Sequence, residues 1–130
     1  MISSTQAEEH RSAGKEVLAV SISSDLLRGH TDTIILTQLM LEDSYGYQIN
    51  KNVQERTKGA YGFKEATLYT AFKRLEGAGL ITSYWGEEGA GARRRYYSIT
   101  EEGRKRWAEA RQEWENTRAL LDALTSVEEV

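Results

Sequence analysis

The stretch that decides the fold runs from Ala66 to Gly79, with the sequence Ala-Thr-Leu-Tyr-Thr-Ala-Phe-Lys-Arg-Leu-Glu-Gly-Ala-Gly. Its large apolar residues follow the spacing of one helix face, because Leu68, Phe72 and Leu75 fall at positions i, i+4 and i+7. The opposite side carries a small, a hydroxyl and a basic residue, namely Ala66, Thr70 and Lys73. An aromatic residue, Tyr69, and a second basic residue, Arg74, flank this row. Such a face can enter a DNA groove and bond to base edges and phosphates, although a plain solvated helix face has a similar composition.

The composition limits the class of protein. The chain has 130 residues, enough for one small domain with a real core, and it contains neither cysteine nor proline. Disulfides and cysteine metal sites are therefore excluded. No apolar run approaches the about 18 residues of a spanning helix and no secretory signal pattern is present, so we expect a cytoplasmic protein without membrane contact. The net charge of −3 argues weakly against a nucleic-acid partner. Whether the chain can bind DNA therefore depends on where its basic residues lie.

An arm and a long helix are predicted at the start of the chain. Residues 1–23 are polar and poor in aromatic residues, which favours a flexible N-terminal arm. Ser23 or Ser24 can cap a helix over residues 24–41. Apolar residues cover too much of that helix for a surface position, so we expect it to be buried. These residues are Leu26, Leu27, Ile34, Ile35, Leu39 and Met40.

A second, shorter helix is predicted over residues 45–57. Asp43 or Ser44 can cap its first turn. Its buried side comprises Tyr45, Ile49 and Val53. Residues 58–62 then form a loop or a very short edge strand before the helix described first.

Two strands and a last helix follow. Residues 80–86 and 94–99 are rich in β-branched and aromatic residues, and the glycine-rich residues 88–92 lie between them, which predicts a β-hairpin. Thr100 then supplies an N-cap, and two acidic residues in the first turn match the positive end of the helix dipole. A final helix is therefore expected over residues 100–124.

Three helices followed by a hairpin give the order of a winged helix-turn-helix, so the predicted fold is mainly α with a small β-hairpin. Residues 24–99 would form the DNA-binding domain, in which the third helix enters the major groove and the hairpin lies along the backbone. Three consecutive arginines at the start of the second strand would contact phosphates. The predicted DNA contacts are Ala66, Thr67, Tyr69, Thr70, Lys73, Arg74, Arg93, Arg94 and Arg95.

The last helix, which precedes a tail of residues 125–130, carries a heptad pattern. Its members are Trp107, Trp114 and Leu121, with Ala110, Thr117 and Leu124 between them. Two tryptophans on one stripe hold more apolar area than a lone helix can hide, which predicts a homodimer through Trp107, Ala110, Trp114, Leu121 and Leu124. The two recognition helices would then lie about 34 Å apart and read a palindrome. Alternatively, both tryptophans pack on the first helix of their own chain.

The segment from residue 26 to residue 124 contains a set of short motifs. They are Leu27-Arg28-Gly29, Tyr45-Gly46-Tyr47, Ala66-Thr67-Leu68-Tyr69, Phe72-Lys73-Arg74-Leu75-Glu76, Ser83-Tyr84-Trp85-Gly86, Arg93-Arg94-Arg95-Tyr96-Tyr97 and Thr100-Glu101. As a set they resemble the PadR family of bacterial transcriptional regulators, and more closely its multidrug-sensing LmrR-like branch. The resemblance implies a homodimeric repressor with a winged helix and one C-terminal dimerisation helix, acting on its own gene or on a neighbouring efflux or stress gene.

The resemblance also implies a ligand site. In the LmrR-like branch, planar aromatic drugs enter a flat pore between one tryptophan from each subunit, and Trp114 falls at that position. Two facing indoles can stack on both faces of a planar ligand. The implied ligand contacts are Trp114, Thr117, Leu121, Arg111, Arg118, Leu26 and Thr33. The two arginines depart from that branch, which tends to have an aromatic and an acid there.

An enzyme is poorly supported. The two histidines, His10 and His30, have no third ligand at metal spacing, and a phosphate-binding glycine loop is absent, so we expect neither a metal nor a cofactor. The remaining alternative is a winged helix used only for protein contacts. DNA binding should weaken steeply between about 50 and 200 mM salt, whereas a protein-contact module should not be retained on DNA at any salt.

Overall fold

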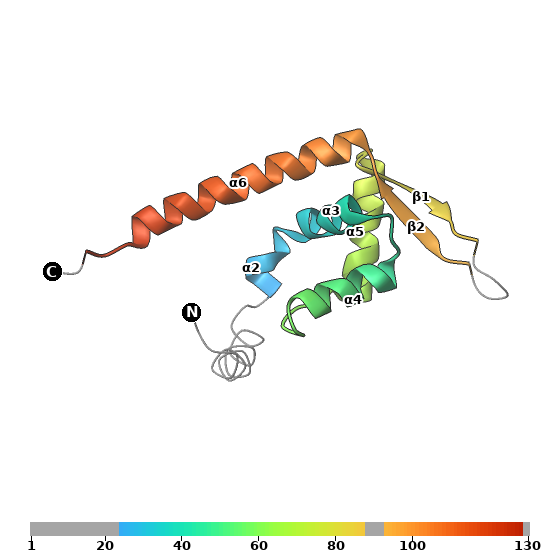
Figure 1. Ribbon diagram of the computed structural model, residues 1–130, viewed down its shortest axis with the longest axis horizontal. Helices are drawn as coiled ribbons and strands as arrows, with labels where there is room; N and C mark the ends of the chain where they lie inside the picture. Colours follow the sequence, from blue (N-terminus) through green and yellow to red (C-terminus); the bar gives the residue numbers. More distant parts are fainter. Residues whose placement is uncertain (1–23, 88–92, 129–130) are drawn as a thin grey trace.

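The computed structural model describes residues 24–87 and 93–128, and Figure 1 shows a group of helices joined to a β-hairpin and to one long final helix. The elements in chain order are α2 (Ser24–Arg28), α3 (Thr31–Leu41), α4 (Gly46–Arg56), α5 (Glu65–Gly77), β1 (Ile81–Trp85), β2 (Arg95–Ile99) and α6 (Glu101–Thr125). The predicted mainly helical fold with a small hairpin is confirmed. The predicted arm, residues 1–23, and the predicted hairpin tip, residues 88–92, lie outside the described residues.

The prediction of one helix over residues 24–41 is wrong, because the chain turns between α2 and α3. The His30 amide donates to the Leu27 carbonyl at 2.8 Å, and the Thr31 hydroxyl donates to the Arg28 carbonyl at 3.1 Å. These bonds satisfy carbonyls at the end of α2, and a glycine at position 29 weakens helix continuation by about 1 kcal/mol relative to alanine. Since α2 is a separate helix, Leu26 does not continue the buried face of α3 and is 69% exposed.

The predicted second helix is present as α4, but neither predicted residue caps it. Tyr45 occupies the N-cap position. The backbone of Ser44 instead pairs with Tyr97 of β2, with N–O distances of 3.2 and 2.7 Å. The Asp43 carboxylate accepts a hydrogen bond from the Tyr84 hydroxyl at 2.6 Å. Both residues therefore tie the start of α4 to the hairpin.

The core forms where α5 packs on α3 and the hairpin. On α5 the predicted face of Leu68, Phe72 and Leu75 is buried, together with Ala71. It joins a cluster that includes Ile35, Leu36 and Leu39 of α3 and Ile49 and Val53 of α4. Phe72 stacks on Tyr97 with ring centroids 4.0 Å apart. The helix ends at Gly77, and Gly79 then adopts a φ of 77°, a conformation that favours glycine after a helix.

The hairpin leads directly into α6. Its strands are antiparallel, with Ile81 opposite Ile99 and Trp85 opposite Arg95. Thr100 caps α6 as predicted, because its hydroxyl oxygen accepts from the Gly103 amide at 3.0 Å. The same hydroxyl donates to the Gly79 carbonyl at 2.7 Å, so the cap also joins α6 to the end of α5.

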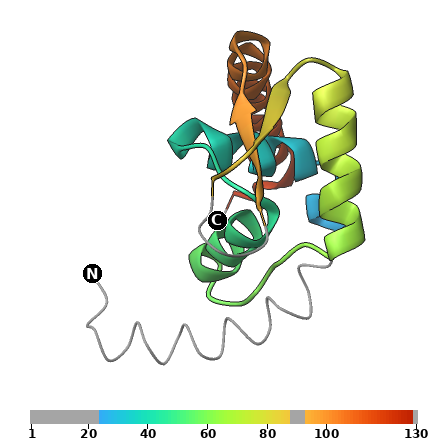
Figure 2. The same cartoon turned by 90° about the vertical axis from the view of Figure 1, so that its right-hand side faces the viewer.

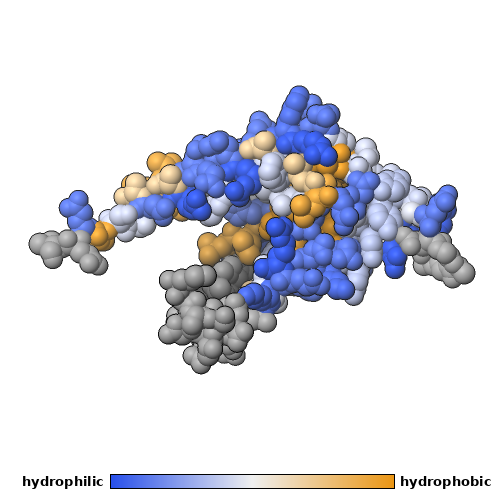
Figure 3. All heavy atoms as spheres, viewed as in Figure 1, coloured by the Kyte–Doolittle hydropathy of each residue, from blue (hydrophilic) through white to orange (hydrophobic). Residues whose placement is uncertain are grey.

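The predicted heptad stripe on α6 is divided between two environments. Near the start of the helix, the Trp107 ring packs against the core and donates through Nε1 to the Thr37 hydroxyl at 2.9 Å, while Ala110 is also buried. This is the packing that the intrachain alternative predicts for a tryptophan. Farther along, α6 extends beyond the other helices, and Figure 3 shows apolar residues on its far half. They are Leu120, Leu121, Leu124 and, just after the helix, Val127. Within the described part of the chain, no helix is long and apolar enough to span a membrane.

Candidate nucleic-acid interface

The outer side of α5 carries the predicted DNA contacts. Figure 2 shows α5 at the edge of the molecule, with its outer side turned away from the other helices. All six predicted residues of this helix are exposed: Ala66, Thr67, Tyr69, Thr70, Lys73 and Arg74. Small and hydroxyl side chains near its start allow close approach to a groove wall, and Lys73 adds a long cationic donor at the centre of the face.

The three predicted arginines of the hairpin lie over aromatic rings. The guanidinium carbons of Arg93 and Arg95 are 5.6 and 5.5 Å from the centre of the Trp85 ring. Arg94 lies 4.8 Å above the Tyr45 ring, at the start of α4. These cation–π contacts hold positive charge on the surface where the hairpin meets α4. Phosphates are the natural partners of such a surface.

Arg95 also has polar partners on β1 and α5. Its guanidinium donates to the Ser83 hydroxyl at 2.7 Å and lies 3.7 Å from the Glu76 carboxylate. The Ser83 hydroxyl in turn donates to Glu76 at 2.6 Å. The structure therefore ties Arg95 to α5 through Ser83 and Glu76.

A stack of tyrosines fixes the hairpin against α4. The rings of Tyr84 and Tyr96 are stacked at 5.6 Å, and Tyr96 meets Tyr45 edge-on at 5.3 Å. The hydrogen bond to Asp43 raises the pKa of Tyr84 to about 12. Since Arg94 lies over the last ring of this series, the stack sets the position of a predicted phosphate contact.

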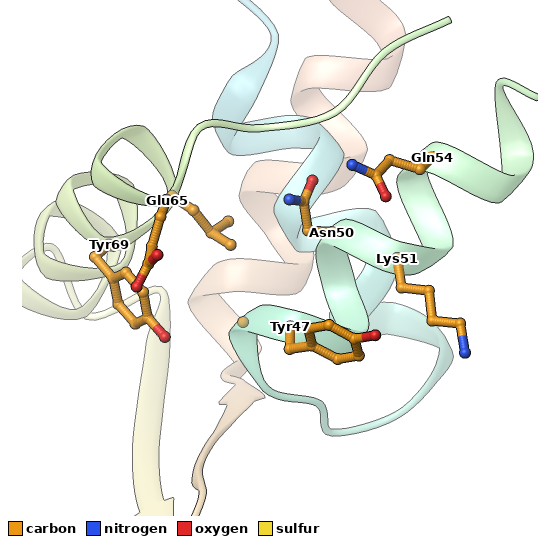
Figure 4. Close-up of a pocket in the computed structure, with 8 residues that line it drawn as sticks. Tyr47, Asn50, Lys51, Gln54, Glu65 and Tyr69 are labelled. Carbon is orange, nitrogen blue, oxygen red and sulfur yellow. The ribbon is translucent and has the colours of Figure 1, made fainter. Parts of the chain in front are cut away.

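Two grooves beside α5 contain residues that the sequence did not assign to DNA. One, of about 490 Å³, separates the hairpin from the two helices and is lined by Tyr45, Gly46, Tyr47, Tyr69, Trp85, Arg93, Arg94 and Arg95. The other, of about 340 Å³, lies between α4 and α5. In Figure 4, Tyr47, Asn50, Lys51 and Gln54 lie along its α4 side and Glu65 and Tyr69 along its α5 side. The motif Tyr45-Gly46-Tyr47 was the available sequence signal for the first groove, because all three of its residues line that groove. Gly46 also allows α5 to pack closely, since an added Cβ there would lie 3.2 Å from the Tyr69 hydroxyl.

Arg74 is already paired within the chain. Its guanidinium bonds to the Asp32 carboxylate in the first turn of α3, with the longer contact from Nε at 3.4 Å. This hydrogen bond raises the pKa of the Arg74 guanidinium. Both side chains remain about half exposed, so the pair lies at the surface, on the flank of α5 that faces away from Tyr69.

The residues predicted to bind a ligand lie on three elements. Trp114 on α6 is 37% exposed and meets His30 edge-on, with ring centroids 5.4 Å apart. Arg111 and Arg118 both pair with Glu115 of the same helix, at 3.3 and 3.0 Å. Thr117 and Leu121 are exposed on α6, Thr33 lies on α3, and Leu26 is exposed on α2. Among the described residues of this set, Trp114 thus lies next to His30, the N-cap residue of α3.

An outward helix flanked by a basic hairpin and three supporting helices defines a winged-helix DNA-binding protein. Residues 35–109, more than half of the chain, match the family described as the transcriptional regulator PadR-like family. The chain belongs to this family, whose members are transcriptional regulators rather than enzymes.

Two solved structures of transcriptional regulators agree with this assignment, and a further relative is similar over most of the chain. A transcriptional regulator from Clostridium thermocellum is 49% identical, with a TM-score of 0.73 over 80% of this chain and 98% of that one. A PadR-family regulator from Clostridium difficile R20291 is 37% identical, with a TM-score of 0.66 over 75% and 99%. An uncharacterised protein from Lysinibacillus sphaericus is 40% identical over 78% of this chain and 93% of its own length.

Proposed function

We propose that the protein is a homodimeric repressor that binds a palindromic operator through α5 and the hairpin of each protomer. The observation that carries the proposal is the exposed polar and basic side of α5 beside the arginines of the hairpin. In this arrangement Lys73 reaches base edges from the centre of α5, and Arg94 contacts the backbone. The family assignment supports DNA binding, and the specific roles of these residues are our inference.

Two substitutions test the division of roles. Lys73→Ala should weaken operator binding by about 1 to 3 kcal/mol and relax base selectivity at one position of each half-site. Arg94→Ala should weaken operator and unrelated duplexes about equally. Lys105→Ala is the matched control, because Lys105 is an exposed lysine on α6 paired with Glu102 at 3.5 Å. The operator is located by footprinting upstream of the protein's own gene, and electrophoretic shifts give the affinities. Unchanged binding in both variants would refute the DNA interface, and no retention of the wild type on any DNA would favour the protein-contact alternative.

The far half of α6 is proposed as the dimer contact. Leu121 and Leu124 are exposed on it, and a second copy of the same helix would cover them. Leu124→Glu should lower the dimer fraction in analytical ultracentrifugation, while Ala108→Glu at another exposed position of α6 should leave it unchanged. A wild type that sediments as a monomer at all concentrations would contradict this assembly.

A planar aromatic effector is proposed to bind at Trp114 between the two protomers. The partly exposed indole supports this, since it can offer a ring face to a flat ligand. Trp114→Ala should abolish quenching of tryptophan fluorescence by a planar aromatic drug, and Trp85→Phe should preserve it. Persistent quenching in Trp114→Ala with an intact dimer would show that the drug binds elsewhere.

A further inference from the structure

The flank of α5 that faces away from the hairpin forms a third groove. It has a volume of about 480 Å³ and is lined by Arg28, Thr31, Ala66, Thr67, Thr70 and Arg74. An adjoining hollow of about 170 Å³ shares Arg28, Thr31 and Thr67 and adds Lys64. Residues from α2, α3 and α5 thus meet beside the predicted recognition helix. The sequence motif Leu27-Arg28-Gly29, which had no predicted role, contributes Arg28 to this groove.

The chemistry of this groove suits a phosphodiester. Arg28, Lys64 and Arg74 supply cationic donors, and the exposed hydroxyls of Thr67 and Thr70 supply neutral ones. Two carboxylates oppose them, because Asp25 pairs with Arg28 at 3.0 Å and Asp32 pairs with Arg74. The Asp25–Arg28 pair is largely exposed and the Asp32–Arg74 pair is about half exposed, so solvent screens both and a phosphate can compete with either carboxylate.

The position of the groove agrees with the geometry of DNA. A helix with its side chains is about 10 to 12 Å across and fills a major groove about 12 Å wide, so both flanks of the helix come close to a phosphate backbone. The hairpin arginines serve the flank that carries Tyr69. The groove of Arg28 and Arg74 lies on the opposite flank, and in Figure 1 α2 and the hairpin lie on opposite sides of α5.

We propose that the Arg28–Arg74 groove is a second DNA-backbone site, which holds the phosphates on the edge of the major groove opposite the hairpin. The proposal rests on the proposed DNA-binding function and extends it to α2 and the start of α3. Asp32 has a defined part in this site, since its carboxylate competes with phosphate for Arg74 and repels the approaching backbone. Asp32 thereby limits affinity for DNA of any sequence.

The test measures salt dependence on a fluorescein-labelled duplex of random sequence and on the footprinted operator. Arg28→Ala should lower the slope of log affinity against log salt by about one on both duplexes, and Arg28→Lys should restore it. Lys64→Ala should act in the same direction. Arg56→Ala is the matched control, because Arg56 is an exposed arginine in the last turn of α4 that does not line this groove.

Asp32→Asn gives a result of opposite sign. It keeps the shape of the side chain and removes its charge, so affinity for the random duplex should rise several-fold and the salt slope should steepen. An unchanged slope in Arg28→Ala, or weaker binding in Asp32→Asn with its far-ultraviolet circular dichroism intact, would overturn the second site while the wild type still binds DNA. Loss of affinity for the operator alone would assign Arg28 to base recognition and also overturn it. A wild type that binds neither duplex would overturn the proposed function itself.

Discussion

Replacing Gly103 with alanine should destabilise the fold, although the same change stabilises most helices. Gly103 is buried in the first turn of α6, where an added Cβ would lie 2.1 Å from the Leu80 carbonyl oxygen and 2.6 Å from Cγ1 of Ile99. The Leu80 carbonyl oxygen belongs to the backbone and already accepts a hydrogen bond from the Thr100 amide at 3.1 Å. It therefore cannot move away from the new Cβ without weakening that hydrogen bond. Overpacking of this kind lowers the free energy of unfolding by about 3 kcal/mol, whereas the higher helix propensity of alanine raises it by at most about 1 kcal/mol. We therefore expect a net loss of about 2 kcal/mol.

Gly77→Ala is the matched control for this prediction. Gly77 lies in the last turn of α5, and an added Cβ there would meet nothing within 4 Å, so alanine should raise stability by about 0.5 to 1 kcal/mol. Urea unfolding at one fixed protein concentration measures both variants, because the unfolding of the proposed dimer would depend on concentration. The two midpoints should move in opposite directions with similar m-values. A Gly103→Ala variant as stable as Gly77→Ala would refute the close packing of α6 on the hairpin base.

Substitutions at three further residues test separate contacts. Trp107→Phe removes the hydrogen bond to Thr37 and should lower the free energy of unfolding in urea by about 1 kcal/mol or slightly more. Thr100→Ala removes the cap of α6 and should also cost about 1 kcal/mol, whereas Thr100→Ser should recover most of it. Tyr84 has a raised pKa of about 12 in the folded state, so its bond to Asp43 stabilises the fold below pH 10 and this contribution is lost as pH rises toward 12. Tyr84→Phe should remove a tyrosinate absorbance that titrates near pH 12, and an unchanged titration would contradict this contact.

Local patterns predicted the elements that local interactions decide. The face of Leu68, Phe72 and Leu75 has a clear helical period, and Thr100 caps its helix through a bond to the residue three positions ahead. The hairpin followed from β-branched and aromatic residues on both sides of a glycine-rich segment. In each case the deciding contact lies within a few residues or between adjacent strands.

Contacts between distant residues were not predictable in the same way. The apolar residues on both sides of Gly29 favoured one continuous helix, and the break is visible only once α2 and α3 take separate positions. Ser44 has the properties of a cap, yet its backbone pairs with Tyr97, which is far along the chain. The same holds for the candidate site. The α5 and hairpin residues could be named from sequence, but the groove of Arg28 and Arg74 requires three elements to meet.

The net charge of −3 misrepresents how this chain meets DNA, because the charges are unevenly placed. Residues 24–100 hold ten basic and nine acidic residues, a net charge of +1, whereas the remainder holds seven basic and eleven acidic residues, a net charge of −4. Several carboxylates of the winged helix are bonded within the chain, among them Asp43 to Tyr84 and Glu76 to Ser83. On α6 the acids pair mainly with arginines of the same helix, and that helix extends about 1.5 Å per residue away from the hairpin. Since charges are screened beyond about 10 Å at 0.1 M salt, the distant acids add little repulsion at α5. The salt dependence of binding should therefore report the basic residues around α5 and the hairpin rather than the charge of the whole chain.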